Sequence, residues 1–265
     1  MCAEDPWQCA AFYATFAVVP LADKVGSGRP VIVVHGTPGD RDTWTRVADR
    51  CPPGVSLWRV ELADHGAAPD GEGDFSLYER DLEAVLREAD GPVILGALSI
   101  GAFVCLRLLP RLGDQVARFV ACAPVAGFSE QDSQMRRDLA ASLRIGAATP
   151  EGLVGEFLEL LLPRDERDAL AEDLILRSAK CSAERLARAI ERVAPIGSPP
   201  FVLTSFHTPT VIFHAERDAM AAVEHAERLA KLGEHVALHR LNSASHMLPL
   251  SHPAEIAKVL FSDSM

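Results

Sequence analysis

The sequence has too few cysteines and too few basic residues for several classes of protein. Its 265 residues contain six cysteines and no C-x-x-C pair, so neither a disulfide scaffold nor a structural zinc site is expected. Acidic residues (37) outnumber Lys and Arg (26), and the formal net charge is −11. Because no basic block offsets that charge, nucleic acid and anionic membrane surfaces are not expected partners. We expect the partner to be a small molecule.

Long apolar runs are also missing. The longest near-continuous run spans residues 10–22, which is too short to cross a bilayer. It follows Glu4 and Asp5 instead of the basic residues that open a signal peptide. We therefore expect a cytoplasmic protein in which residues 10–22 form an N-terminal strand or strand pair. The motifs H-E-x-x-H, G-x-G-x-x-G and G-x-x-x-x-G-K-[ST] are absent as well, so neither a metal nor a cofactor is expected.

Short β-type segments alternate with helical patterns along most of the chain. The segment 31–35 (VIVVH) is almost wholly apolar, as in a strand that is buried on both faces. Residues 100–112 are apolar on nearly all sides, which indicates a helix packed against a sheet. Ser76 and Glu79 have the spacing of a capping box and predict another helix start. The remaining expected strands are 55–62, 92–98, 117–123, 209–214 and 235–241. The alternation predicts an α/β fold with a mostly parallel sheet covered by helices on both faces.

The alternation stops at about residues 129–200, where only helical patterns occur. Thr149, which precedes a proline, has the features of a helix start, and Ser182 opens a further helix. We therefore expect a single domain whose core is formed by residues 1–128 and 201–265. The helical segment between them is expected to form a cap over that core.

A serine lies where the strand expected at 92–98 runs into the next helix. Ser99 stands in the sequence Ala-Leu-Ser-Ile-Gly. A nucleophile on such a tight turn needs small residues two positions before and after it, and Ala97 and Gly101 meet that need. The pattern departs from G-x-S-x-G only at Ala97. The alternative is that Ser99 is no more than the N-cap of a buried helix.

Two later segments supply the acid and the base that a serine nucleophile requires. Asp218 follows one expected strand, and His246 follows the next strand, 28 residues later. Glu216 is a second candidate for the acid, and Asp218 has the alternative role of capping a helix expected at 219–232. The order Ser99, Asp218, His246 resembles that of the α/β-hydrolase superfamily, and the resemblance covers the core on both sides of the helical insertion.

The resemblance implies an α/β-hydrolase fold with an oxyanion hole. The segment 35–39 (HGTPG) is similar to the H-G-x-x-G segment of these enzymes. That match places one backbone N–H donor at Thr37, and the second donor would be Ile100, directly after the nucleophile. Residues 61–68 keep only part of the family's D-x-x-G-x-G-x-S stretch, so His65 is assigned to packing within a turn.

By the same resemblance the protein is expected to be a cofactor-free serine hydrolase. Ser99 would attack an acyl carbonyl, His246 would act as base and then acid, and Asp218 would orient the imidazole. The substrate would be a carboxylic ester, lactone or thioester of a small molecule, as in the branch of enol-lactonases, small esterases and menaquinone-pathway synthases. The residues expected to line the pocket supplied by the cap are Met135, Leu139 and Phe157.

Three other functions stay open at this point. The same residues could serve a lyase or C–C bond hydrolase, a perhydrolase that uses peroxide in place of water, or a non-catalytic ligand-binding scaffold. An intact set of Ser, Asp and His argues against the scaffold. His214 and His239 are expected to be structural, and His252 is expected to cap a helix or lie at the surface. By the resemblance, His35 would line the oxyanion loop without taking part in proton transfer.

Overall fold

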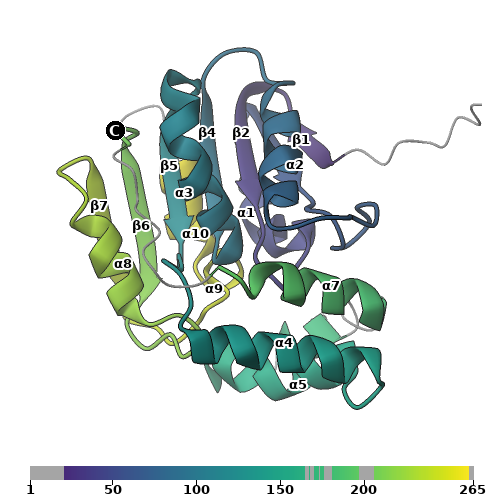
Figure 1. Ribbon diagram of the computed structural model, residues 1–265. Coiled ribbons are helices and arrows are strands. Elements are labelled where there is room, and N and C mark those ends of the chain that lie inside the picture. Colours follow the sequence, from purple (N-terminus) through teal and green to yellow (C-terminus); the bar gives the residue numbers. More distant parts are fainter. Residues whose placement is uncertain are drawn as a thin grey trace, which may run out of the picture.

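The computed structural model describes residues 21–164, 167, 170–172, 174, 175, 181–196 and 206–262. Its centre is a seven-stranded sheet in the order β1-β3-β2-β4-β5-β6-β7 (Figure 1). The strands are β1 (Ala22–Gly26), β2 (Gly28–Val34), β3 (Gly54–Val60), β4 (Val93–Leu98), β5 (Val116–Cys122), β6 (Thr210–Ala215) and β7 (Val236–Leu241). β1 pairs antiparallel with β3, and all the other pairs are parallel. The predicted fold class, with its mostly parallel sheet, is confirmed.

Each of the six strands expected from an apolar run forms close to its predicted position. β2 begins three residues before its apolar run, since its ladder with β3 already starts where Gly28 pairs with Gly54. The expectation for residues 10–22 falls almost entirely outside the described residues. β1 begins at Ala22 and is polar and half-exposed, as suits a strand at the edge of a sheet.

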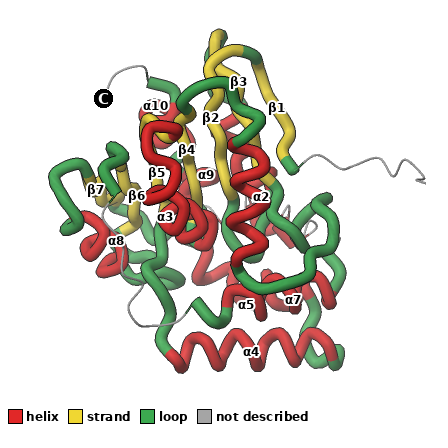
Figure 2. Tube along the Cα trace, turned by 45° about the horizontal axis from the view of Figure 1, so that its top comes forward, coloured by secondary structure: helices red, strands yellow, loops and turns green. Residues whose placement is uncertain are grey.

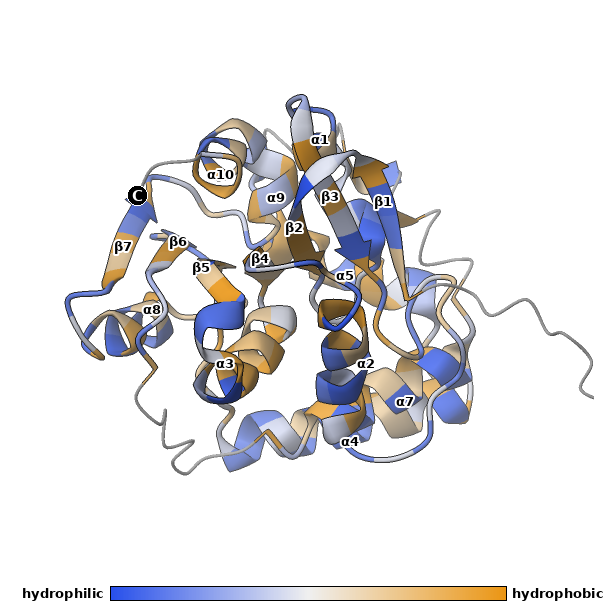
Figure 3. Cartoon of the chain, turned by 90° about the horizontal axis from the view of Figure 1, so that it is seen from above, coloured by the Kyte–Doolittle hydropathy of each residue, from blue (hydrophilic) through white to orange (hydrophobic). Residues whose placement is uncertain are grey.

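Helices cover both faces of the sheet, as predicted (Figure 3). One face carries α2 (Ser76–Leu86), α3 (Ile100–Leu112) and α8 (Val223–Ala230), and the other carries α1 (Thr45–Ala48), α9 (Leu248–Ser251) and α10 (Pro253–Leu260). Alternate residues of β2 enter the two cores: Ile32 and Val34 join the first, and Val31 and Val33 the second. All four are fully buried, which is why the strand is apolar without alternation. Short 3₁₀ helices, η1 (Arg41–Trp44) and η2 (Gly113–Gln115), complete the connections.

In the described part of the chain, three helices between β5 and β6 gather at one end of the sheet (Figures 1 and 2). They are α4 (Glu130–Arg144), α5 (Pro150–Leu161) and α7 (Ala183–Val193). They share an apolar cluster of their own that includes Leu143, Leu153 and Ile190. The predicted helix starts are confirmed, because Thr149 caps α5 and Ser182 caps α7 through side-chain hydrogen bonds. Within the described residues, no helix is both long and apolar enough to cross a membrane.

The capping box predicted at Ser76 is wrong. Helix α2 does begin at Ser76, but the carboxylate of Asp74 accepts both its backbone N–H (3.0 Å) and its hydroxyl (2.6 Å). Glu79 does not reach back to the helix start. It is buried and pairs with Arg107 and Arg111 of α3. Glu79 therefore joins two neighbouring helices, a role that its local spacing does not reveal.

Candidate active site

Ser99 lies on a strained turn between β4 and α3. Its backbone has φ 52° and ψ −115°, a conformation that costs a residue other than glycine on the order of 1–3 kcal/mol. The N–H of Ser99 donates a 2.9 Å hydrogen bond to the carbonyl of Cys122, at the end of β5. Neighbouring strands thus hold the strained residue in place, and Ser99 begins α3 without capping it through its side chain.

Only small residues fit around this turn. A Cβ added to Gly101 would lie 2.3 Å from the carbonyl oxygen of His35, and one added to Gly36 would lie 3.1 Å from Cβ of Ser99. Ala97 is fully buried. The turn is therefore pressed against the end of β2, which explains the small residues that the sequence places on either side of Ser99.

The loops after β6 and β7 bring Asp218 and His246 together. Oδ2 of Asp218 accepts a 2.8 Å hydrogen bond from Nδ1 of His246, and its side chain is fully buried. Oδ1 accepts the backbone N–H groups of Met220 (2.8 Å) and Ala221 (3.0 Å). The helix expected at 219–232 is therefore shorter, because this turn delays the start of α8 to Val223.

The environment of Asp218 keeps its carboxylate ionised. Burial opposes ionisation, but the charge and hydrogen bond of His246 and the two backbone N–H groups outweigh it, so the pKa of Asp218 is lowered. An ionised partner at Nδ1 keeps the proton of a neutral His246 on that nitrogen and leaves Nε2 as the basic atom. Glu216, the other candidate for the acid, lies exposed at the surface.

Ser99 and His246 line the same cavity, which has a volume of about 130 Å³. Among the described residues, no hydrogen bond joins the two side chains, as is common in active sites without substrate. Helix α5 supports the histidine loop, because the carbonyl of Leu161 accepts the N–H of His246 at 2.9 Å. The cavity wall also includes all three residues predicted for the pocket, Met135, Leu139 and Phe157.

A second cavity, with a volume of about 320 Å³, lies next to the first. Met247 and Leu161 are among the residues that line both cavities.

Two backbone N–H groups are available at this cavity. Thr37 and Ile100 both line it, and neither N–H donates a hydrogen bond to another described residue. The Ile100 N–H belongs to the first turn of α3, where the helix dipole favours negative charge. The Nδ1–H of His35 donates to the carbonyl of Gly36 at 2.8 Å. Because that carbonyl and the Thr37 N–H belong to one trans peptide, they point in opposite directions.

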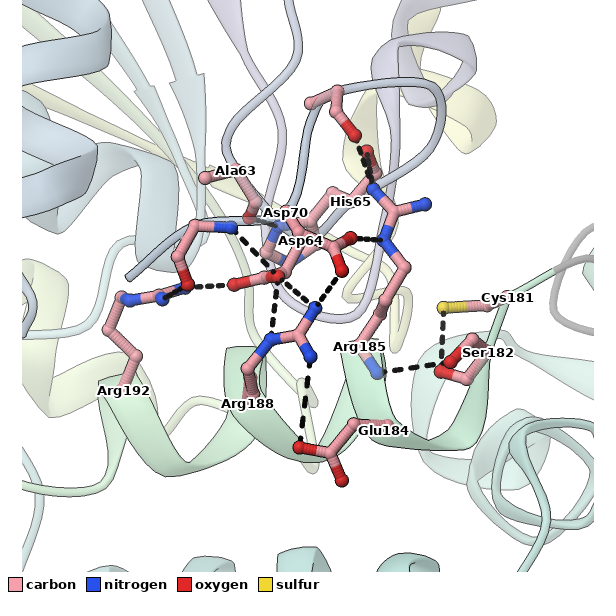
Figure 4. Close-up of polar contacts among 12 residues, drawn as sticks. Ala63, Asp64, His65, Asp70, Cys181, Ser182, Glu184, Arg185, Arg188 and Arg192 are labelled. Carbon is pink, nitrogen blue, oxygen red and sulfur yellow. Dashed lines mark hydrogen bonds and ion pairs between the residues drawn. The ribbon is translucent and has the colours of Figure 1, made fainter. Parts of the chain in front are cut away.

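A second polar cluster connects α7 to the loop between β3 and α2 (Figure 4). Asp64, at φ 64° and 1% exposed, accepts hydrogen bonds from Arg188 (2.7 Å) and Arg192 (2.5 Å). Burial opposes ionisation of Asp64, but the hydrogen bonds of Arg192 and Arg188 outweigh it and lower its pKa. Sequence reasoning missed this cluster. Its signal is the spacing of Arg185, Arg188 and Arg192, which lie on one face of a helix.

His214 and His239 lie in strands β6 and β7, as the sequence predicts, and His252 precedes α10 without capping it through its side chain. His214 is fully buried, and its Nδ1–H donates to the carbonyl of Ala215. The ring of His239 stacks on that of Phe213 in the sheet. Nδ1 of His252 lies within hydrogen-bond distance (2.8 Å) of Oγ of Ser251. In the described part of the chain, no group of three or more His, Cys, Asp and Glu side chains is arranged to hold a metal ion.

Comparison with known proteins identifies relatives over most of the chain. Residues 31–259 match the model of a family described as "Alpha/beta hydrolase family". The chain is 27% identical over 234 residues to the "Biotin biosynthesis bifunctional protein BioHC" of Cellvibrio japonicus, and the match covers 86% of this chain and 46% of that protein. It thus spans about half the length of that relative.

Two further proteins are similar to this chain over nearly the full length of both chains. The chain is 23% identical to the pimeloyl-[acyl-carrier protein] methyl ester esterase of Chromobacterium violaceum, covering 91% of this chain and 96% of that protein. The solved structure of a thermophilic esterase from Thermogutta terrifontis superposes with a TM-score of 0.80, at 21% identity and with 90% of each chain covered. The structural likeness, at this identity, establishes the fold.

Proposed function

This chain belongs to the alpha/beta hydrolase family, and we propose that it is a serine esterase that cleaves small carboxylic esters through an acyl-enzyme at Ser99. The observation that carries the proposal is the arrangement around one cavity. A serine on a strained turn and a histidine bonded to a buried carboxylate both line its wall. A weakly nucleophilic hydroxyl needs such a base, and the base needs an orienting group.

In the first half of the reaction, Oγ of Ser99 attacks the carbonyl carbon of the ester while Nε2 of His246 takes the hydroxyl proton. Asp218 stays ionised and stabilises the imidazolium that forms. The tetrahedral intermediate collapses when His246 gives its proton to the leaving alcohol. The alcohol departs, and the acyl group remains as an ester on Ser99.

In the second half, a water molecule takes the place of the alcohol. His246 removes one of its protons, the resulting hydroxide oxygen adds to the acyl carbon, and the proton then returns to Oγ of Ser99 as the carboxylic acid leaves. The N–H groups of Thr37 and Ile100 are the proposed donors to the oxyanion in both halves. One such donor contributes on the order of 3 kcal/mol to the transition state. Side chains, backbone groups and water supply every step.

The cavity wall favours an apolar acyl group. Apart from Ser99, His246 and the loop at Thr37, most of its lining is aliphatic or aromatic, and α4 and α5 of the helical insertion supply Leu139, Leu153 and Phe157. The relative from Chromobacterium violaceum is named as an esterase of a methyl ester, which supports an ester over a lactone or thioester. We propose that the helical insertion acts as the cap that encloses this acyl group.

The test combines turnover with labelling. p-Nitrophenyl esters from acetyl to decanoyl are assayed with the native protein, with Ser99→Ala and with Ser142→Ala, a serine on α4 outside the cavity. We expect turnover by the native protein and by Ser142→Ala, and loss of at least about 10³-fold with Ser99→Ala. A phosphonate probe followed by mass spectrometry should then place the label on Ser99. A folded native protein that hydrolyses none of the esters, or a label on another residue, would refute the proposal.

A further inference from the structure

The side chain of Thr37 is held by a histidine from a different part of the chain. Oγ1 of Thr37 lies 3.0 Å from Nε2 of His65. Nδ1 of His65 lies 2.9 Å from the carbonyl oxygen of Ala63. Because a carbonyl only accepts, Nδ1 carries the proton and the neutral ring accepts at Nε2. The hydroxyl of Thr37 therefore donates to His65.

Thr37 needs such a support because of the residue before it. The peptide that carries the Thr37 N–H begins at Gly36, and a glycine leaves the rotation of that peptide largely unrestricted. The ring of His35 holds the carbonyl end of the peptide. The hydroxyl of Thr37 belongs to the residue at the other end of the peptide, so its hydrogen bond to His65 holds the second side of the same unit.

His65 is itself firmly placed. Its ring centroid lies 4.8 Å from that of His35 and 5.7 Å from that of Tyr78, and the residue is only 3% exposed. Burial, together with the nearby His35, lowers the pKa of His65 to about 3. The ring therefore stays neutral at any pH at which an esterase would be assayed, and Nε2 stays an acceptor.

Helix α7 holds the residues on both sides of His65 (Figure 4). Asp64 is bound by Arg188 and Arg192, and the carbonyl of Gly66 accepts a 3.0 Å hydrogen bond from Arg185. The helical insertion is thus joined to the loop that carries His65, and through His65 to Thr37. This chain of contacts connects one helix outside the sheet to a backbone donor at the cavity.

We propose that His65 is a positioning residue, which aims the backbone N–H of Thr37 at the oxyanion by accepting the hydrogen bond of its side chain. The proposal rests on the oxyanion role proposed for Thr37. It assigns to His65 a part in transition-state stabilisation that is exerted through Thr37.

The matched pair Thr37→Val and Thr37→Ser tests it. Valine has the shape of threonine without the hydroxyl, and serine keeps the hydroxyl, while both keep the backbone N–H. kcat and KM are measured with p-nitrophenyl butyrate, and the inhibition constant is measured with a butyl trifluoromethyl ketone, whose adduct with a serine carries an oxyanion. For Thr37→Val we expect kcat to fall about 10-fold, the inhibition constant to rise by a similar factor and KM to change less than about 2-fold. Thr37→Ser, which keeps the hydroxyl, should lose clearly less kcat and less inhibitor affinity than Thr37→Val.

A second pair of variants tests the same hydrogen bond from the side of His65, in case Thr37→Val does not fold. His65→Gln keeps an acceptor near the position of Nε2, and His65→Leu removes it, so the kcat of the glutamine variant should exceed that of the leucine variant. If Thr37→Val retains native kcat and inhibition while Ser99 is labelled, the positioning role is refuted and the esterase function stands. If Thr37→Ser is as impaired as Thr37→Val, packing and not the hydroxyl is responsible, and the positioning role is again refuted. A native protein without turnover or label overturns both proposals.

Discussion

The carboxylate of Asp218 binds His246 with one oxygen and the turn before α8 with the other. Oδ2 accepts Nδ1–H of His246 at 2.8 Å, while Oδ1 accepts two backbone N–H groups. Asp218 thus performs the role of partner to the histidine but does not cap a helix, because α8 begins only at Val223. Its hydrogen bonds to the turn before α8 orient the carboxylate, so that its second oxygen is aimed at the imidazole.

Replacing Asp218 by Asn should abolish most of the activity. The amide cannot stabilise an imidazolium and favours the wrong tautomer of His246, so we expect kcat to fall by roughly 10³–10⁴-fold. Glu216→Gln, which removes an exposed carboxylate two residues away, should change kcat less than about 2-fold. The kcat values of both variants are measured by steady-state kinetics with the same p-nitrophenyl ester. If Glu216→Gln lowers kcat more than Asp218→Asn does, the carboxylate that orients His246 is that of Glu216.

Asp64→Asn should destabilise the protein far more than Asp70→Asn. Asparagine tolerates the positive φ of Asp64, but the variant leaves Arg192, whose side chain is 3% exposed, without its carboxylate. Loss of one partner of a buried ion pair costs about 3 kcal/mol. Asp70 pairs with the same helix, but its side chain is 66% exposed, and its loss should cost less than about 1 kcal/mol. Urea unfolding of the two variants measures the difference.

The contribution of Asp64 should depend on pH in a defined direction. Its pKa in the folded protein lies below its unfolded value of about 4. The stabilisation is therefore complete above that value and is lost as the pH falls through the folded pKa. The difference in Tm between the native protein and Asp64→Asn should be largest near neutral pH and shrink in acid. A difference that grows on acidification would contradict the ion pair.

Gly101→Ala and Gly155→Ala should have effects of opposite sign. A methyl group on Gly101 would lie 2.3 Å from a backbone oxygen of His35, so the turn at Ser99 must shift. We expect a loss of at least about 2 kcal/mol in stability and a large fall in kcat. Gly155 lies within α5, with open space where its Cβ would be. There alanine should stabilise by up to about 1 kcal/mol, or roughly 2–4 °C in Tm. Thermal unfolding and kinetics of both variants check this.

Phe157→Ala should lengthen the space available to the acyl chain. The ring forms part of the cavity wall, and its removal should raise the ratio of kcat/KM for decanoyl over butyryl esters by about 10-fold. Leu160→Ala removes an exposed side chain from the same helix and should leave the ratio unchanged. If the ratio is the same in both variants, the acyl chain does not run along α5.

The strands and the turn at Ser99 were predictable because local physics specifies them. β2, for example, is apolar at successive positions because each of its faces is covered, and a helix at 100–112 must bury nearly all of its sides. The small residues at 97 and 101 follow from the close approach of two backbones. The capping box failed because Glu79 found stronger partners on α3, across a distance in sequence that no local pattern spans.

The sequence by itself determined the order of strands and helices, the mostly parallel sheet and the three loops that carry Ser99, Asp218 and His246. These follow from hydrophobic periodicity and from the rule that parallel strands end at one edge of a sheet. Beyond these three residues, only the tertiary structure decided which side chains meet. Arg188 and Asp64 are 124 residues apart in sequence, and Thr37 and His65 are 28 apart. Such contacts depend on how loops and the helical insertion pack in space, and a short pattern in one segment holds no information about a partner that another segment supplies.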